Sequence, residues 1–180
     1  RLSGSTGYVV AAALKQSMES FKFIDFSLTY KGIRDEFSVK DNAMEHSIQY
    51  TFEADGVPDG SIDIQIMASN PDAQDSFNCN FAIADEMAAY KKASQYNRFK
   101  EAMKGYTNKL MIGITTAGDN ANSFGYRRME YAAKVAAGTV KDDELFAFIA
   151  RADVDDKGNC DFTNPIQHRK ANPNYGVTIR

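Results

Sequence analysis

The chain has 180 residues, of which 43% are apolar and 25% are charged, a composition typical of a globular protein rather than of a disordered one. Its 21 basic and 24 acidic residues leave a formal charge of −3, which disfavours a strongly basic nucleic-acid-binding domain. No apolar run approaches the roughly 18 residues that a membrane-spanning helix needs.

The first half of the chain changes its hydrophobic period twice. A glycine-rich loop is followed by an apolar run at 8–13, which predicts a strand. From Leu14 onward apolar residues recur every three or four positions, and this spacing predicts an amphipathic helix that ends at Gly32. Between 46 and 67 apolar and polar residues alternate on either side of the turn formers at 55–60, which predicts two antiparallel strands.

The second half carries three short apolar runs, typical of strands that are covered on both faces. Helical patterns separate them, with Ser94 and Ser123 as expected N-caps and Gly105 and Gly138 as expected ends. This alternation predicts an α/β fold with a mostly parallel sheet, flanking helices and the antiparallel hairpin, as a single domain over 1–180. The three runs are 81–84, 110–114 and 145–149.

Polar pairs follow two of these predicted strands. Asp85 and Glu86 come directly after the first run, and Thr115 and Thr116 directly after the second. Ligands bind beyond the carboxyl ends of parallel strands, and strands joined by one crossover helix usually lie close together. Two adjacent acids at a strand end suit Mg²⁺ binding by one and activation of a water by the other, while the hydroxyls could sense a γ-phosphate.

Purely structural roles fit the same residues. Asp85 could cap the following helix with Glu86 in solvent, and the threonines could form side-chain turns. The segment 153–158 hints at a calcium loop, but Lys157 and Asn164 stand where an EF-hand needs an acidic or amide residue and a glutamate, so a solvated turn is the better interpretation. The cysteines form no C-x-x-C pair.

Several segments together resemble the ATPase domain of the large terminase subunit of tailed bacteriophages, roughly from Tyr8 to Ile179. Each of them matches a stretch of that family in the same order along the chain. They are Val10–Ala13 with Gln16, Phe81–Glu86, the L-M-I-G-I-T-T-A-G run at 110–118, Asp143 with 146–150, and the A-N-P-N-x-G run at 171–176.

The resemblance implies a P-loop NTPase-like fold and ATP hydrolysis with Mg²⁺ in a viral DNA-packaging motor. By analogy Asp85 is the metal-binding Walker B acid, Glu86 the catalytic glutamate, and Thr115 with Thr116 the nucleotide-sensing coupling motif. The implied partners are double-stranded DNA, the portal protein and the small terminase subunit, in the cytoplasm of an infected or prophage-bearing bacterium.

One departure from that family bears on activity. A phosphate loop needs G-x-x-x-x-G-K-[ST], and the sequence contains no Gly-Lys step. Since the chain opens at Arg1 without a methionine, we expect a fragment that lacks the phosphate loop and the nuclease domain and is inactive alone. Its unpaired strand edges would favour self-association. The alternatives are a non-catalytic α/β assembly module that retains the terminase fold, and a helicase-like ATPase.

Overall fold

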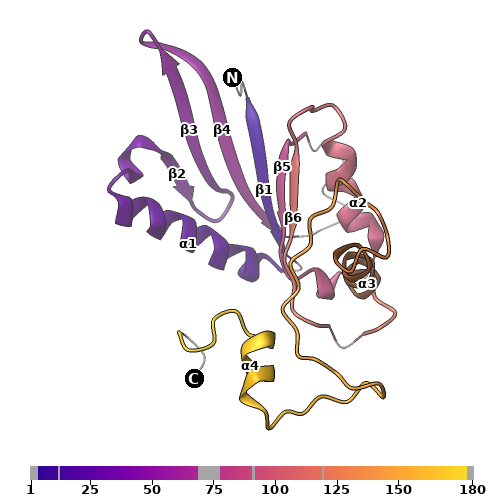
Figure 1. Ribbon diagram of the computed structural model, residues 1–180. Helices are drawn as coiled ribbons and strands as arrows, with labels where there is room; N and C mark the ends of the chain where they lie inside the picture. The colour runs from indigo at the N-terminus through magenta and orange to yellow at the C-terminus, as the bar shows by residue number, and fades with distance from the viewer. Residues whose placement is uncertain (1–3, 12, 69–77, 91, 119, 178–180) are drawn as a thin grey trace. The chain divides into compact units, whose positions relative to one another are not determined.

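The computed structural model describes residues 4–11, 13–68, 78–90, 92–118 and 120–177 (Figure 1). These residues form two compact units, 1–127 and 128–180, which are considered separately. The elements in chain order are β1 (Ser5–Ala11), α1 (Leu14–Lys31), η1 (Arg34–Glu36), β2 (Ser38–Asp41), β3 (His46–Ala54), β4 (Val57–Ala68), β5 (Phe81–Ala84), η3 (Met87–Ala89), α2 (Ala93–Ala102), β6 (Leu110–Gly113), α3 (Phe124–Ala136) and α4 (Pro165–Ala171).

The first unit is built on a six-stranded sheet with the order β2-β3-β4-β1-β5-β6 (Figure 1). Strand β1 pairs in parallel with β4 on one side and with β5 on the other, and β5 pairs in parallel with β6. Strand β3 is antiparallel to both of its neighbours, β2 and β4, because short turns join it to each of them. The mostly parallel α/β sheet with an antiparallel hairpin is therefore confirmed.

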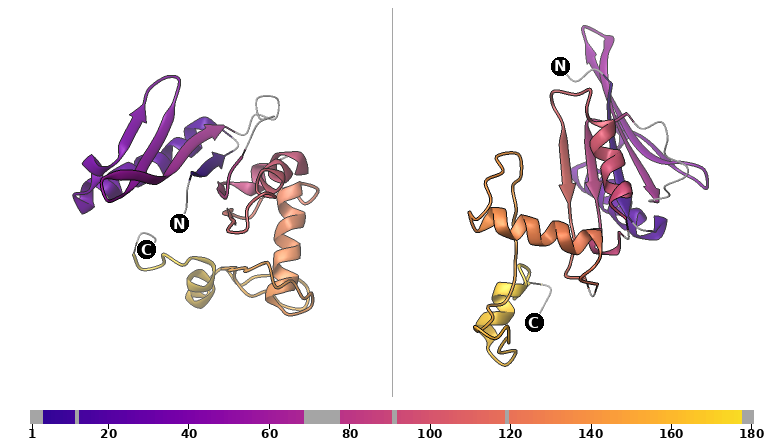
Figure 2. Two further views of the ribbon diagram at one scale, coloured as in Figure 1. Left: turned by 90° about the horizontal axis from the view of Figure 1, so that it is seen from above. Right: turned by 90° about the vertical axis from the view of Figure 1, so that its right-hand side faces the viewer.

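The two faces of the sheet are covered by different helices (Figures 1 and 2). Side chains alternate along β1, so Val9 packs with Phe21 of α1, while Val10 packs with Phe99 of α2. Each of these four side chains is at most 2% exposed. Strand β1 has residues buried on both faces, as expected for the centre of an α/β sheet.

Helix α1 matches the predicted helix closely. It runs from Leu14 to Lys31 and ends at Gly32, whose φ of 69° only glycine adopts without cost. Its apolar stripe supplies Phe21 to the core, whereas Leu14 at the start of that stripe is 42% exposed. The serine at position 17 is fully buried and ties three elements together, because its Oγ accepts from the amide of Ala11 and donates to the carbonyl of Met67.

The second unit is small and has no buried core among its described residues. Its helix α4 begins after Asn164, whose Oδ1 accepts from the amide of Ile166 at 3.0 Å, the bond of an N-cap residue. An ion pair between Lys170 and Asp153 ties this helix to the preceding loop. Hydrogen bonds and ion pairs made by side chains, rather than a buried core, therefore connect the segments of this unit.

Three local predictions were wrong. The expected third strand at 145–149 has no regular secondary structure, and Phe146 and Phe148 are 89% and 75% exposed. β-Propensity is local, but a strand forms only against a partner, and no described strand pairs with this segment. Helix α2 begins at Ala93 after Lys92, so Ser94 is not its N-cap. Strand β1 begins at Ser5 rather than at position 8, because Ser5 already lies in register with β4.

Candidate functional site

The acidic pair lies at the carboxyl end of β5, between the ends of β1 and β6. The amide of Asp85 donates to the carbonyl of Val10 at 2.8 Å and so extends the ladder to β1 by one residue. On the other side the amide of Ile114 donates to the carbonyl of Ala84 at 2.9 Å and continues the ladder to β6. The acids and the threonines therefore follow neighbouring parallel strands, as expected.

Glu86 has a left-handed backbone conformation, with φ 52° and ψ 45°. A residue with a side chain adopts this conformation at a cost of about 1–2 kcal/mol, and such residues are concentrated at functional sites. Two bonds hold it in place: its amide donates to Oδ1 of Asp85 at 2.9 Å, and its carbonyl accepts from Ala89 at 2.9 Å. The left-handed backbone of Glu86 turns the chain sharply as it leaves β5.

The short helix η3 then crosses to the end of β6. The amide of Met87 donates to the carbonyl of Ile114 at 3.2 Å. The amide of Ala88 donates to Oγ1 of Thr115 at 2.9 Å, and this hydroxyl in turn donates to the carbonyl of Thr116, also at 2.9 Å. The hydroxyl of Thr115 therefore joins the acidic segment to the threonine segment by a direct bond.

Three glycines leave room for η3. A Cβ added to Gly113 would lie 2.3 Å from Sδ of Met87, and one added to Gly118 would lie 2.9 Å from Cβ of Ala88. A Cβ added to Gly125, in the first turn of α3, would lie 2.2 Å from the carbonyl oxygen of Met87. These separations are below van der Waals contact, so η3 packs directly against all three glycines. Sequence reasoning missed this cluster, because η3 and the three glycines belong to different segments that meet only in the folded chain.

The start of α3 completes this region. Ser123 is buried, and its Oγ accepts from the amide of Tyr126 at 3.1 Å, which confirms it as the expected N-cap. The same bond fixes where the helix begins, and this puts Gly125 against η3.

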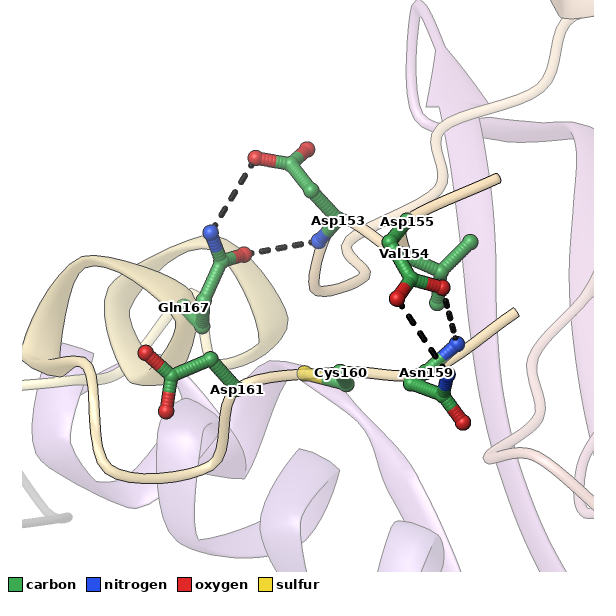
Figure 3. Close-up of a pocket in the computed structure, with 7 residues that line it drawn as sticks. All are labelled: Asp153, Val154, Asp155, Asn159, Cys160, Asp161 and Gln167. Carbon is green, nitrogen blue, oxygen red and sulfur yellow. Dashed lines mark hydrogen bonds between the residues drawn. The ribbon is translucent and has the colours of Figure 1, made fainter. Parts of the chain in front are cut away.

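An open pocket lies in the second unit, beside α4 (Figure 3). Its volume is about 430 Å³, and it opens widely to solvent. Asp155 is fully engaged with its own loop, because its carboxylate accepts from the amides of Lys157 and Asn159. The described residues contain no group of three or more His, Cys, Asp or Glu side chains arranged to hold a metal ion. The residues lining the pocket are Asp153, Val154, Asp155, Asn159, Cys160, Asp161 and Gln167.

Among the described residues, no helix is both long and apolar enough to cross a bilayer.

A mostly parallel sheet with helices on both faces and polar residues beyond its strand ends is an α/β architecture in which ligands bind at the carboxyl ends of the strands. Residues 3–134 match the model of the terminase large subunit ATPase domain, and the chain belongs to this family.

Three relatives illustrate the match. The chain is 34% identical over 98 residues to Protein YmfN of Escherichia coli K12, which covers 54% of this chain and 21% of YmfN. It superposes on the large terminase of bacteriophage HK97 with a TM-score of 0.75 at 14% identity, over all of this chain and 34% of that one. The large terminase of a thermophilic bacteriophage gives a TM-score of 0.55 at 14% identity, over 76% of this chain and 31% of that one.

The two structural relatives share the fold with this chain at low sequence identity. The chain spans about a fifth of YmfN and a third of the HK97 protein.

Proposed function

We propose that this chain forms the acidic side of the ATP-hydrolysing site of a DNA-packaging terminase. The observation that carries the proposal is the joined pair of strand ends. Asp85 and Glu86 follow β5, Thr115 follows β6, and the bond from the amide of Ala88 to Oγ1 of Thr115 connects them. In nucleoside-triphosphate hydrolases such strand ends face the phosphates of the substrate.

The donor set fits Mg²⁺ at Asp85. This half-buried carboxylate uses Oδ1 to accept from the amide of Glu86, and Mg²⁺ typically takes one or two carboxylates and keeps several waters. Bound there with ATP, Mg²⁺ would neutralise charge on the β- and γ-phosphates. Glu86 would orient a water molecule and accept its proton. Thr116 would respond to the γ-phosphate, and the hydroxyl of Thr115, which donates to the carbonyl of Thr116 and accepts from the amide of Ala88, would carry that response to the acidic segment.

The phosphates themselves need a further element. No Gly-Lys step occurs in the 180 residues, so these residues contain no phosphate loop of the G-x-x-x-x-G-K-[ST] type. We infer that the whole gene product supplies this loop and that residues 1–180 alone bind ATP weakly. Membership of the terminase family supports DNA, the portal protein and the small terminase subunit as partners of the whole protein.

The test uses the complete gene product that contains residues 1–180. We expect Glu86→Gln to abolish ATP turnover while Mg-ATP still binds, because the amide keeps the size of the side chain but cannot accept a proton. Glu53→Gln makes the same chemical change at an exposed position on β3 and should leave turnover unchanged. Normal hydrolysis by the Glu86 variant would refute the role proposed for this carboxylate.

A non-catalytic assembly module that retains the terminase fold is the second candidate. The two candidates differ in nucleotide binding. If the complete gene product binds no Mg-ATP at millimolar concentration and shows no turnover, the module is correct and the proposed ATPase role is wrong.

A further inference from the structure

The carbonyl oxygen of Val10 accepts two hydrogen bonds at the end of β1. One comes from the amide of Asp85 at 2.8 Å, and the other from the hydroxyl of Tyr90 at 3.1 Å. Asp85, the first residue of the acidic pair, directly follows β5, and Tyr90 directly follows η3. The shared oxygen therefore anchors both ends of the segment that contains Glu86.

The surroundings of Tyr90 fix its hydroxyl in one direction. The residue is 0% exposed and belongs to an apolar cluster with Ala84, Met87 and Tyr96. Burial raises the pKa of the Tyr90 hydroxyl, and the nearby negative charge of Asp85 raises it further. The hydroxyl therefore stays a neutral donor at ordinary pH. A buried donor needs an acceptor, and Val10 supplies it.

The strained turn between these anchors needs such support. Left alone, Glu86 would relax from its left-handed conformation, because this conformation persists only where the surrounding structure imposes it. The bond to Thr115 holds the middle of η3, while the two bonds at Val10 hold the residues before and after the turn.

We propose that Tyr90 is a positioning residue for the acidic pair, acting through its hydroxyl bond to the carbonyl of Val10. This inference rests on the proposed ATPase function for its catalytic consequence. The effect of Tyr90 on the conformation of the turn does not depend on that function, because the hydrogen bond from Tyr90 to Val10 lies within this chain. Small displacements of a reacting group reduce rates steeply, so a loosened turn would slow turnover more than it weakens binding.

The first test is hydrogen exchange on residues 1–180. Tyr90→Phe keeps the ring and removes only the hydroxyl. We expect the amides from Asp85 to Ala89 to exchange about ten-fold faster, while those of β3 and β4 change less than about two-fold. Tyr131→Phe is the matched control, because it removes another tyrosine hydroxyl bond, to Asp142. Unchanged exchange at 85–89, or an equal rise throughout the first unit, would overturn the proposal.

The second test is kinetic and uses the complete gene product. Tyr90→Phe should lower kcat about ten-fold and change KM for ATP less than about two-fold, while Tyr131→Phe should match the parent protein. Full kcat for Tyr90→Phe beside an inactive Glu86→Gln would overturn the positioning role and leave the proposed function intact. If the parent protein neither binds Mg-ATP nor hydrolyses it, the proposed function is wrong, and the exchange result still decides whether Tyr90 holds the turn.

Discussion

Replacing Gly125 with alanine tests the packing of η3 against α3. Alanine at a helical position is normally more stable than glycine by about 1 kcal/mol. Here the added Cβ would lie 2.2 Å from the carbonyl oxygen of Met87 and 2.8 Å from Cα of Ala88. Both contacts are backbone atoms, which cannot rotate away, so a displacement of about 1 Å is required. Overpacking of this kind costs about 1–3 kcal/mol, and we take the upper end.

The net expectation for Gly125→Ala is a loss of about 2 kcal/mol in the free energy of unfolding. For a chain of this size that corresponds to a Tm lower by roughly 4–8 °C. The measurement is thermal and urea unfolding followed by circular dichroism. Gly105→Ala is the control, because a Cβ there meets nothing within 4 Å, and it should be neutral or stabilising by up to about 1 kcal/mol. A Gly125 variant as stable as the parent protein would refute the close packing of η3.

Three more predictions concern the acidic segment and the core. Glu86→Gly should raise the free energy of unfolding by up to about 1 kcal/mol in urea, because glycine adopts the left-handed backbone without cost, and should still abolish turnover. The control is Asp55→Gly in the hairpin turn, where φ is 54°, and this variant should keep turnover. Thr115→Val should lower the free energy of unfolding by about 1–3 kcal/mol in the same assay, because the amide of Ala88 loses its acceptor. Thr115→Ser keeps the hydroxyl and should retain the stability of the parent protein. Burial raises the pKa of the Cys79 thiol to about 11, so stability should fall from about pH 9 toward pH 11, where only the unfolded thiol ionises readily. Cys79→Ala should make that decline smaller, and the buried tyrosine hydroxyls, whose pKa values are also raised by burial, account for the part that stays.

Much of the secondary structure of the first unit could be predicted from the hydrophobic period and from the residues that begin and end helices and turns. The stripe of α1 and its stop at Gly32, the hairpin of β3 and β4, and the N-cap at Ser123 are local patterns, and the structure confirmed them. Strand pairing is not local. The segment 145–149 has a strand-like composition, yet no described strand pairs with it.

The candidate site was predictable in outline only. The placement of Asp85 and Thr115 after adjacent parallel strands followed from the order of apolar runs. Neither the left-handed backbone of Glu86 nor the contact from Tyr90 to Val10 has a signature in the sequence, because both arise from packing between distant segments.

The central place of β1 has a consequence for synthesis on the ribosome. Among the described strands of the sheet it emerges first, yet its partners come much later, since Ser5 pairs with Ile62. At roughly 5–20 residues per second, translation needs on the order of 3–11 s to deliver β4. During that interval the apolar residues Val9, Val10 and Ala11 lack both of their neighbouring strands. We therefore expect the nascent chain to expose an apolar segment without its partner strands for several seconds, a state that is prone to aggregation.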